Sequence, residues 1–129
     1  MQPKWQHSEG LAKSRILFGM DNTVGDGCIL VEAPLSAIML DQYGIGNAVS
    51  SFGCRLSDDQ VVLLRSNYNK VLVFYDPDEA GYAGMRDAVG KLRDFVDTYA
   101  VIGHRDDPAA LSREDVVSAL ERITPGWMI

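Results

Sequence analysis

The chain has 129 residues, 47% of them hydrophobic, so its length excludes a second full-sized domain and its composition suits one compact domain. A formal net charge of −6 argues against a surface that wraps nucleic acid as a whole. No apolar run is long enough to span a membrane, and the first residues, MQPKWQHSEG, lack the apolar core of a signal peptide. We therefore expect a cytoplasmic protein without a membrane partner.

Basic residues are concentrated at the start of the chain, and the cysteines form no zinc motif. The leader carries Lys4, Lys13 and Arg15 against a single glutamate, whereas the rest of the chain is acidic. Such a leader is consistent with a phosphate contact beside a metal site and also with an ordinary solvated segment. Cys28 and Cys54 fit no zinc-ligand spacing, so we expect two reduced thiols and no zinc.

Apolar runs of strand length alternate with amphipathic stretches of helix length. We expect strands over residues 28–32, 47–51, 70–75 and 99–103, and helices over residues 34–43 and 79–96 and after Ser57 and Ser112. Both serines begin an N-terminal capping pattern, Ser-Asp-Asp-Gln and Ser-Arg-Glu-Asp. Strands that are apolar throughout and separated by helices predict an α/β fold, with a mostly parallel four-stranded sheet and helices on both faces.

The stretch Asp76-Pro77-Asp78-Glu79-Ala80 places three carboxylates directly after an apolar strand. One interpretation is structural: Asp76 caps a helix, Pro77 is its first residue and Glu79 completes a capping box. The other is functional, because Asp76 and Asp78 lie two residues apart on an extended chain and share one side. Their mutual repulsion favours a hard cation such as Mg²⁺. This stretch alone leaves both interpretations open.

The acidic residues fall where parallel sheets bind ligands, beyond the carboxyl ends of the strands. Glu32 ends the first predicted strand, Asp76 and Asp78 follow the third, and Asp106 and Asp107 follow the fourth. Helix capping accounts for Asp76 but not for Glu32, which precedes Ala-Pro. The arrangement therefore favours a metal site at this edge of the sheet.

Four segments in this order resemble the Toprim domain of bacterial DnaG-type DNA primases: VEAPLSAIML, NAVSSFGCRLSDDQ, VLVFYDPDEAGYAGMRDA and RDDPAAL. The leader is similar to the segment that precedes this domain in those primases, through Lys4-Trp5-Gln6-His7-Ser8, Lys13 and Leu17-Phe18-Gly19. The resemblance implies the Toprim fold. It divides the chain into a leader (1–24), a Toprim domain (25–123) and a C-terminal tail (124–129).

The resemblance also implies roles for individual acidic residues. Glu32 matches the family's catalytic glutamate, Asp76 and Asp78 match its D-x-D metal ligands, and Asp107 matches the first aspartate of a later D-P-x-[DE] element. Gly81 matches the glycine that follows the D-x-D pair. The expected metal ligands are therefore Glu32, Asp76, Asp78 and Asp107, the first three also being catalytic. The implied cofactor is Mg²⁺ or Mn²⁺ for nucleotidyl transfer.

Basic residues are expected to contact phosphates. Lys4 and Lys13 match residues of the family thought to contact template or nucleotide phosphates, and we add Arg15 as a neighbour of the same sign. Arg105 has two open interpretations, since it could meet a nucleotide phosphate or neutralise the adjacent Asp106 and Asp107.

Three positions depart from the family's pattern. The usual E-G-x-x-D motif reads Glu32-Ala33-Pro34-Leu35-Ser36, which loses the glycine and the aspartate. Ala33 is compatible with the motif if its φ is negative. Ala109 stands where the later element often has an acid. The site is expected to keep its central acids and to lack two outer ones.

The resemblance implies a primase catalytic domain or subunit that makes RNA primers from ribonucleotides on a single-stranded DNA template. The zinc-binding module and most of the basic half of a primase are not in this sequence, so we expect a partner protein to supply them. A replicative helicase is a further possible partner. A split primase of a phage, acting in the bacterial or infected cell, fits better than an excised fragment. Two alternatives stay open: a Toprim-type metal-dependent nuclease, and a non-catalytic module that binds a replication partner.

Other residues are expected to have simpler roles. His7 and His104 lack a Cys or Ser partner at a telling spacing and are expected to be exposed polar residues. Trp5 is expected to pin the leader to the domain rather than to stack on a base.

Overall fold

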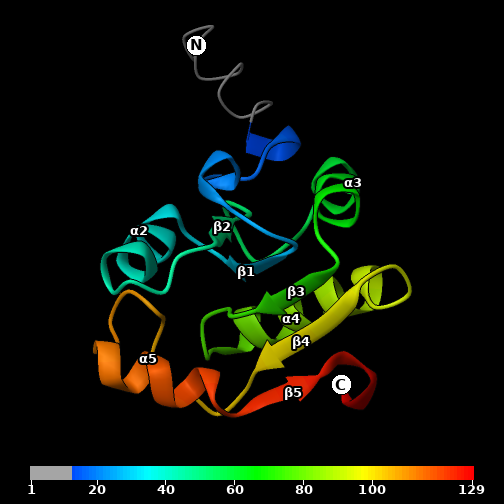
Figure 1. The fold of residues 1–129 in the computed structure, drawn as a ribbon. Helices are drawn as coiled ribbons and strands as arrows, with labels where there is room; N and C mark the ends of the chain where they lie inside the picture. The colour runs from blue at the N-terminus through cyan, green and yellow to red at the C-terminus, as the bar shows by residue number, and fades with distance from the viewer. Residues whose placement is uncertain (1–12) are drawn as a thin grey trace, which may run out of the picture.

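Five strands form a single sheet in the computed structural model, which describes residues 13–129. The order in the sheet is β2 (Ala48–Ser50), β1 (Gly27–Val31), β3 (Lys70–Val73), β4 (Asp97–Val101) and β5 (Ile123–Pro125). The first four strands are parallel and β5 pairs antiparallel to β4 (Figure 1). The predicted α/β fold with a mostly parallel sheet is confirmed. The count of four strands is wrong, because Ile123–Pro125 pairs with β4 and adds a fifth.

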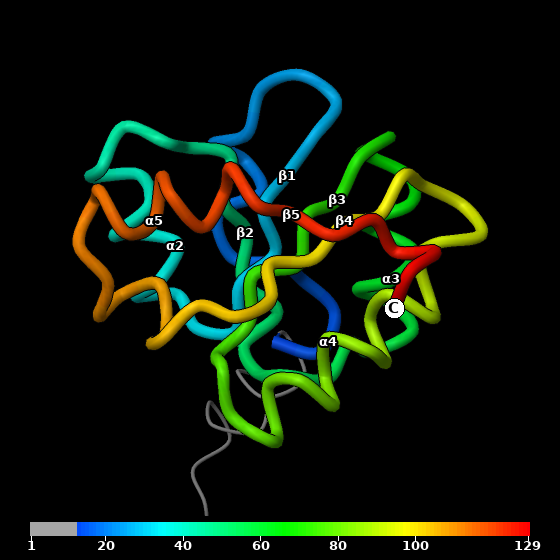
Figure 2. The backbone as a smooth tube through the Cα atoms, turned by 90° about the horizontal axis from the view of Figure 1, so that it is seen from below, coloured from blue at the N-terminus to red at the C-terminus, as the bar shows by residue number. Residues whose placement is uncertain are grey.

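Helices cover both faces of the sheet. They are α2 (Pro34–Gln42), α3 (Asp58–Asn67), α4 (Glu79–Leu92) and α5 (Arg113–Leu120), with two short 3-10 turns, η1 (Met20–Asn22) and η2 (Gly126–Met128). Helices α2 and α5 lie on one side of the strands and α3 and α4 on the other (Figure 2). Among residues 13–129, none of the helices is both long and apolar enough to cross a membrane.

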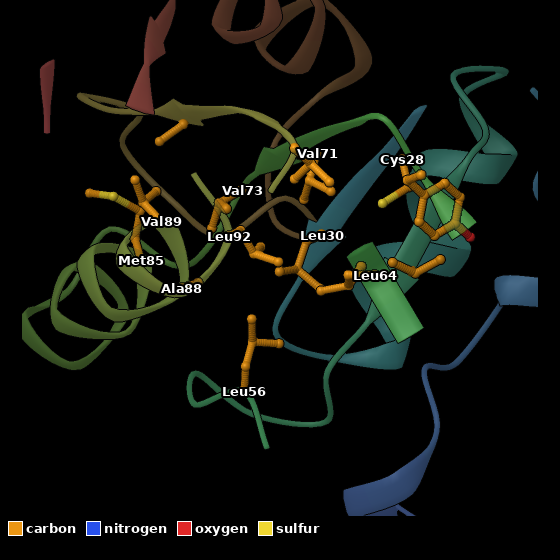
Figure 3. Packing of buried hydrophobic residues seen from close by; sticks show 14 of the residues in the cluster. Cys28, Leu30, Leu56, Leu64, Val71, Val73, Met85, Ala88, Val89 and Leu92 are labelled. Atoms are coloured by element: carbon orange, nitrogen blue, oxygen red, sulfur yellow. The ribbon is translucent and has the colours of Figure 1, made fainter. Parts of the chain in front are cut away.

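Alternate residues of the central strand supply the two apolar cores. Val71 and Val73 are fully buried against α3 and α4, together with Leu30 of β1 and Leu64 of α3 (Figure 3). Phe74, one position beyond β3, is buried in the second core, under α2 and α5. This alternation is the period of two that an extended chain imposes, and burial on both faces explains why the strands are apolar throughout.

Capping at two helices follows the local sequence. The Ser57 hydroxyl accepts from the amide of Gln60 at 3.1 Å, and the Gln60 side chain accepts from the amide of Ser57 at 3.0 Å. The Ser112 hydroxyl accepts from the amide of Asp115 at 3.1 Å. Both predicted helix starts are confirmed. Cys28 and Cys54 are free thiols, as expected.

Among the predicted elements, β4 and α4 differ most from the structure in their boundaries. Strand β4 covers residues 97–101 rather than 99–103, because Asp97 pairs with Lys70 at the start of β3. Helix α4 ends at Leu92 rather than near Val96. Ile123 lies in β5 with 41% of its surface exposed.

Candidate active site

The parallel strands β1, β3 and β4 are neighbours in the sheet, so their carboxyl ends meet at one edge. Glu32 follows β1 directly, Asp76 and Asp78 follow β3, and Asp107 follows β4 by six positions. The structure therefore brings the predicted acidic residues together at this edge.

Glu32 is the most firmly held of these acids. Its side-chain Oε1 accepts from the backbone amide of Asp76 at 3.0 Å, which joins the ends of β1 and β3. Its backbone carbonyl accepts from the amide of Gly53 at 2.8 Å and from the hydroxyl of Ser50 at 2.9 Å. Three hydrogen bonds from two segments thus fix both its backbone and its carboxylate.

Asp78, not Asp76, is the N-cap of α4. Its Oδ1 accepts from the amide of Gly81 at 2.6 Å, and the helix begins at Glu79. The capping prediction for Asp76 is wrong because the helix starts at Glu79 and the amide of Gly81 in its first turn donates to Asp78. The capping interpretation of the stretch is thus confirmed for Asp78, and its role as a metal ligand stays a prediction.

Gly81 allows the chain to come this close. A Cβ at this position would overlap the backbone carbonyl of Asp76 and lie 2.9 Å from Oε1 of Glu32. No residue with a side chain fits there without moving the end of β3 or the Glu32 carboxylate. The glycine is therefore part of the construction of the site.

The acids interact electrostatically. Burial raises the pKa of Asp76 from 3.8 to about 6, and repulsion from four neighbouring carboxylates adds to the shift: Glu32, Asp107, Asp78 and Asp106. Burial likewise raises the pKa of Glu32, with smaller contributions from Asp78 and Asp107, although the bond from the Asp76 amide acts in the opposite direction. A divalent cation would relieve this repulsion.

As they stand, no three His, Cys, Asp or Glu side chains in the described part of the chain lie close enough together to hold a metal ion. One carboxylate oxygen of Glu32 and one of Asp78 accept from backbone amides, which leaves the second oxygen of each for another partner. Their chemistry still suits Mg²⁺ or Mn²⁺, which prefer carboxylate oxygens and keep several waters, and so need few protein ligands.

Beside the acids lies an open groove of about 510 Å³. Its lining includes the acids Glu32 and Asp76 together with Lys13, Phe18 and Phe52. Of the predicted basic residues, Lys13 is thus placed at the site, whereas Lys4 lies outside the described residues.

The two arginines point elsewhere. Arg15 lies 3.9 Å from Asp59 of α3, with 70% of its side chain exposed. Arg105 pairs with Asp115 of α5 at 3.3 Å, so its ion partner is neither Asp106 nor Asp107. The ion pair of Arg105 thus connects the segment after β4 to α5, and both interpretations of its role stay predictions.

A family model described as Toprim-like matches residues 29–111 of the chain. The chain belongs to the Toprim-like family. The DNA primase of Clostridium acetobutylicum is 36% identical to it over 82% of this chain, which spans only 18% of that protein's length.

Solved structures of primases share the fold. A structure of the Aquifex aeolicus primase, containing its zinc-binding and RNA polymerase domains, superposes with a TM-score of 0.76 at 27% identity, over 88% of this chain and 31% of that one. A DnaG primase catalytic domain bound to single-stranded DNA gives a TM-score of 0.70 at 26% identity, over 88% of this chain and 40% of that one.

The structure explains one of the departures from the family's motif, the alanine at position 33. Ala33 has φ −113° and ψ 145°, an extended conformation open to any L residue, so replacing the family's glycine introduces no strain. Ser36 is 3% exposed in the first turn of α2, where a carboxylate would be buried. Ala109 is half-buried beside buried Pro108.

His104 is buried rather than exposed, which corrects the prediction for this residue. One ring nitrogen, Nε2, lies 2.6 Å from the Tyr75 carbonyl, and the ring contacts Phe74 edge-to-face at 5.1 Å. A carbonyl only accepts, so Nε2 carries the proton, and burial lowers the pKa of the ring. His104 thus ties the segment after β4, which contains Asp107, to the end of β3.

Residue patterns gave no indication of two further contributors, Gln60 and Phe52. Gln60 was expected only as a capping residue, yet its buried amide donates to carbonyls of the leader. Phe52 lies in the loop between β2 and α3, and it contributes to the site because its side chain lines the groove. The capping pattern accounts for only one of the four hydrogen bonds that the Gln60 side chain makes, the one from the Ser57 amide, and not for the three that its amide donates to backbone carbonyls.

Proposed function

We propose that this chain is the metal-binding catalytic part of a DNA primase, which joins ribonucleotides into RNA primers on a single-stranded DNA template. The observation that carries the proposal is the set of mutually repelling carboxylates at the ends of β1, β3 and β4. The likeness to DNA primases supports the reaction class.

The proposed metal ligands are Glu32, Asp76 and Asp78, with Asp107 completing the acidic edge. Toprim domains of primases generally depend on a divalent metal ion, which agrees with this oxygen-rich set. Bound Mg²⁺ or Mn²⁺ would supply Lewis-acid stabilisation of phosphate oxygens. The protein itself orients the Glu32 carboxylate through the hydrogen bond from the Asp76 amide, and it holds Asp78 at the start of α4.

The proposed partners follow from what this chain provides. A DnaG catalytic domain has been solved with single-stranded DNA, which supports such a template here. Lys13 is one phosphate contact at the site, with Lys4, Arg15 and Arg105 as weaker candidates. We propose that a zinc-binding region and further basic regions come from other protein segments, in the cytoplasm, where a replicative helicase is an additional partner.

Metal binding is tested by an Asp76→Asn, Asp78→Asn double variant. Asparagine is as good an N-cap as aspartate, so the start of α4 is kept while two charges are removed. Calorimetric titration with Mn²⁺ is expected to show weak binding to the parent chain and none to the variant, and without metal the variant should melt no lower than the parent chain. Equal binding by both proteins would contradict the proposed site.

The reaction is tested in a chimera, in which this chain replaces the matching segment of the Clostridium acetobutylicum primase. Template-dependent incorporation of ribonucleotides is expected, and the double variant supplies the matched control. Cleavage of a labelled oligonucleotide without incorporation would identify a nuclease instead. Metal-independent behaviour with neither activity would indicate a binding module.

A further inference from the structure

The groove beside the acids is lined by residues of different chemistry. The carboxylates of Glu32 and Asp76 share the lining with Lys13, Phe18 and Phe52, in a volume of about 510 Å³. A volume of this size is typical of sites that hold a small organic ligand. The combination of carboxylates, one cation and two aromatic rings narrows what that ligand can be.

The rings and the cation are close neighbours. Phe18 and Phe52 meet edge-to-face with their centroids 6.2 Å apart, and Nζ of Lys13 lies 5.9 Å from the centroid of Phe52. Both rings are half-buried, so each keeps accessible surface. An ammonium beside an aromatic ring can contact a phosphate and a nucleobase of one molecule.

Phe52 is held in an unusual backbone conformation. Its φ is 60°, in the left-handed region that bulky residues rarely adopt. The surrounding hydrogen bonds impose it: the Phe52 amide donates to the hydroxyl of Ser50 at 3.0 Å, and the Ser51 hydroxyl donates to the carbonyl of Gly53 at 2.6 Å.

The same loop fixes the catalytic glutamate. The amide of Gly53, next to Phe52, donates to the backbone carbonyl of Glu32 at 2.8 Å, and Ser50 donates to that carbonyl too. The ring of Phe52 is therefore held in a set position relative to the acidic edge. Strained backbone that is held in this way is concentrated at binding and catalytic sites.

We propose that Phe52, supported by Phe18, is a stacking wall for the nucleobase of a nucleoside triphosphate. The triphosphate would lie between Lys13 and the acidic edge. This inference rests on the proposed primase function and adds the subsite for the base. An aromatic ring that stacks on a base makes no hydrogen bonds to the edge of that base, so it does not distinguish one base from another. The stacking wall therefore accepts all four bases, as a template-directed reaction requires.

The test compares ATP with inorganic tripolyphosphate, which has the phosphates but no base. Calorimetry is carried out on the 129-residue chain at pH 8 with saturating Mn²⁺. ATP is expected to bind about tenfold more tightly than tripolyphosphate, the range for stacking of one base. GTP, CTP and UTP are expected to bind within about threefold of ATP.

Two substitutions at Phe52 separate stacking from folding. Phe52→Gly removes the ring, and glycine adopts φ 60° without strain, so the variant is expected to fold. Its affinity for ATP should fall to the level of its affinity for tripolyphosphate. The affinity for tripolyphosphate should stay that of the parent chain. Phe52→Trp should keep or increase the preference for ATP. Phe95→Ala is the control, because that ring is 57% exposed and packs under Arg65 at the other edge of the sheet, and it should change neither affinity.

Three outcomes would contradict the proposal that Phe52 stacks on the base. Equal affinities of the parent chain for ATP and tripolyphosphate, or equal losses of both in folded Phe52→Gly, would each show that the ring does not contact the base, while the proposed function would stand. Failure of the folded parent chain to bind either ligand would overturn the wall together with the proposed function.

Discussion

The charged carboxylate of Asp76 destabilises the folded protein, and a bound metal ion would remove this effect. Its pKa in the folded protein is raised from 3.8 to about 6, chiefly by burial and then by neighbouring acids. Between these values the folded state binds more protons than the unfolded state, so stability falls as the pH rises through this window and stays lower above it. The site is therefore destabilised at neutral pH until a cation binds.

Replacing this carboxylate by a neutral side chain should therefore increase the stability of the metal-free protein. Without metal, Asp76→Asn is expected to be more stable than the parent chain at pH 8 by about 1 kcal/mol after allowance for solvent screening, with the difference disappearing near pH 4. Added Mn²⁺ should reverse the order, because only the parent chain binds it. Urea unfolding at both pH values measures this.

The control for this prediction is Asp94→Asn, an exposed carboxylate just after α4, at the opposite edge of the sheet. It should change stability little and equally at both pH values. A parent chain that is more stable than Asp76→Asn at pH 8 without metal would contradict the account of the acidic edge.

Helix α4 packs against the β2–α3 loop through a glycine. A Cβ at Gly84 would overlap the backbone carbonyl of Cys54 and approach the Cys54 side chain at 2.7 Å. The close approach between the helix and the loop therefore requires glycine at position 84. Because glycine has a low helix propensity, it destabilises the helix itself at this position.

Two alanine substitutions in α4 should act in opposite directions. Gly84→Ala is expected to destabilise the fold by about 1–3 kcal/mol, the range for overpacking. Gly90→Ala meets nothing within 4 Å at an exposed position. It should stabilise by about 0.5–1 kcal/mol through helix propensity. Thermal melts of both variants give the comparison, and a loss of stability in Gly90→Ala would refute this reading of the helix.

The start of α3 also anchors the leader. The buried amide of Gln60 donates to the carbonyls of Lys13, Ile16 and Ser51 at 3.1, 3.0 and 2.9 Å. The hydroxyl of Ser57 donates to the carbonyl of Ser14. The capping box thus holds the leader, with Lys13 at the groove, and the loop that precedes Phe52.

Gln60→Glu separates these two functions of one side chain. The carboxylate still accepts from the Ser57 amide but cannot donate to the three carbonyls, so we expect a loss of about 2 kcal/mol or more. Amide exchange over residues 16–18 should become faster, and Mn²⁺-dependent binding of tripolyphosphate weaker. Gln60→Met, which loses the capping acceptor too, is the comparison. Unchanged exchange at the leader in Gln60→Glu would contradict the anchoring role.

At the scale of the whole molecule, the chain offers few contacts to DNA. Its net charge is −6, and Lys13 is the cation that the structure places at the groove. Binding of single-stranded DNA by the isolated chain should be weak and should decrease steeply with salt. Efficient priming is therefore expected only with further basic regions present.

This expectation is measured by fluorescence anisotropy of a labelled oligonucleotide over a salt series. The slope of log K against log salt should correspond to only a few phosphates, and Lys13→Ala should reduce it by about one. Lys91→Ala is a suitable control, because Lys91 pairs with Asp87 at 3.1 Å away from the groove, and it should leave the slope unchanged. Tight, salt-independent binding would contradict this view of the surface.

The sequence by itself determined the features that depend on neighbouring residues. Apolar runs identified β1, β3 and β4, and two serines identified the starts of α3 and α5. The positions of Glu32, Asp76 and Asp78 at strand ends predicted a common edge, since parallel strands that alternate with helices must bring those ends together. The resemblance to primases then assigned these acids a chemistry.

Only the tertiary structure decided which polar atoms meet. The amide of Asp76 donates to Glu32, 44 positions away, and the helix cap lies at Asp78 rather than at Asp76. The burial of His104 and the joining of leader and loop by Gln60 likewise depend on contacts between segments far apart in the chain. Such contacts are set by which donors and acceptors remain after the strands have paired, and no local pattern of residues records them.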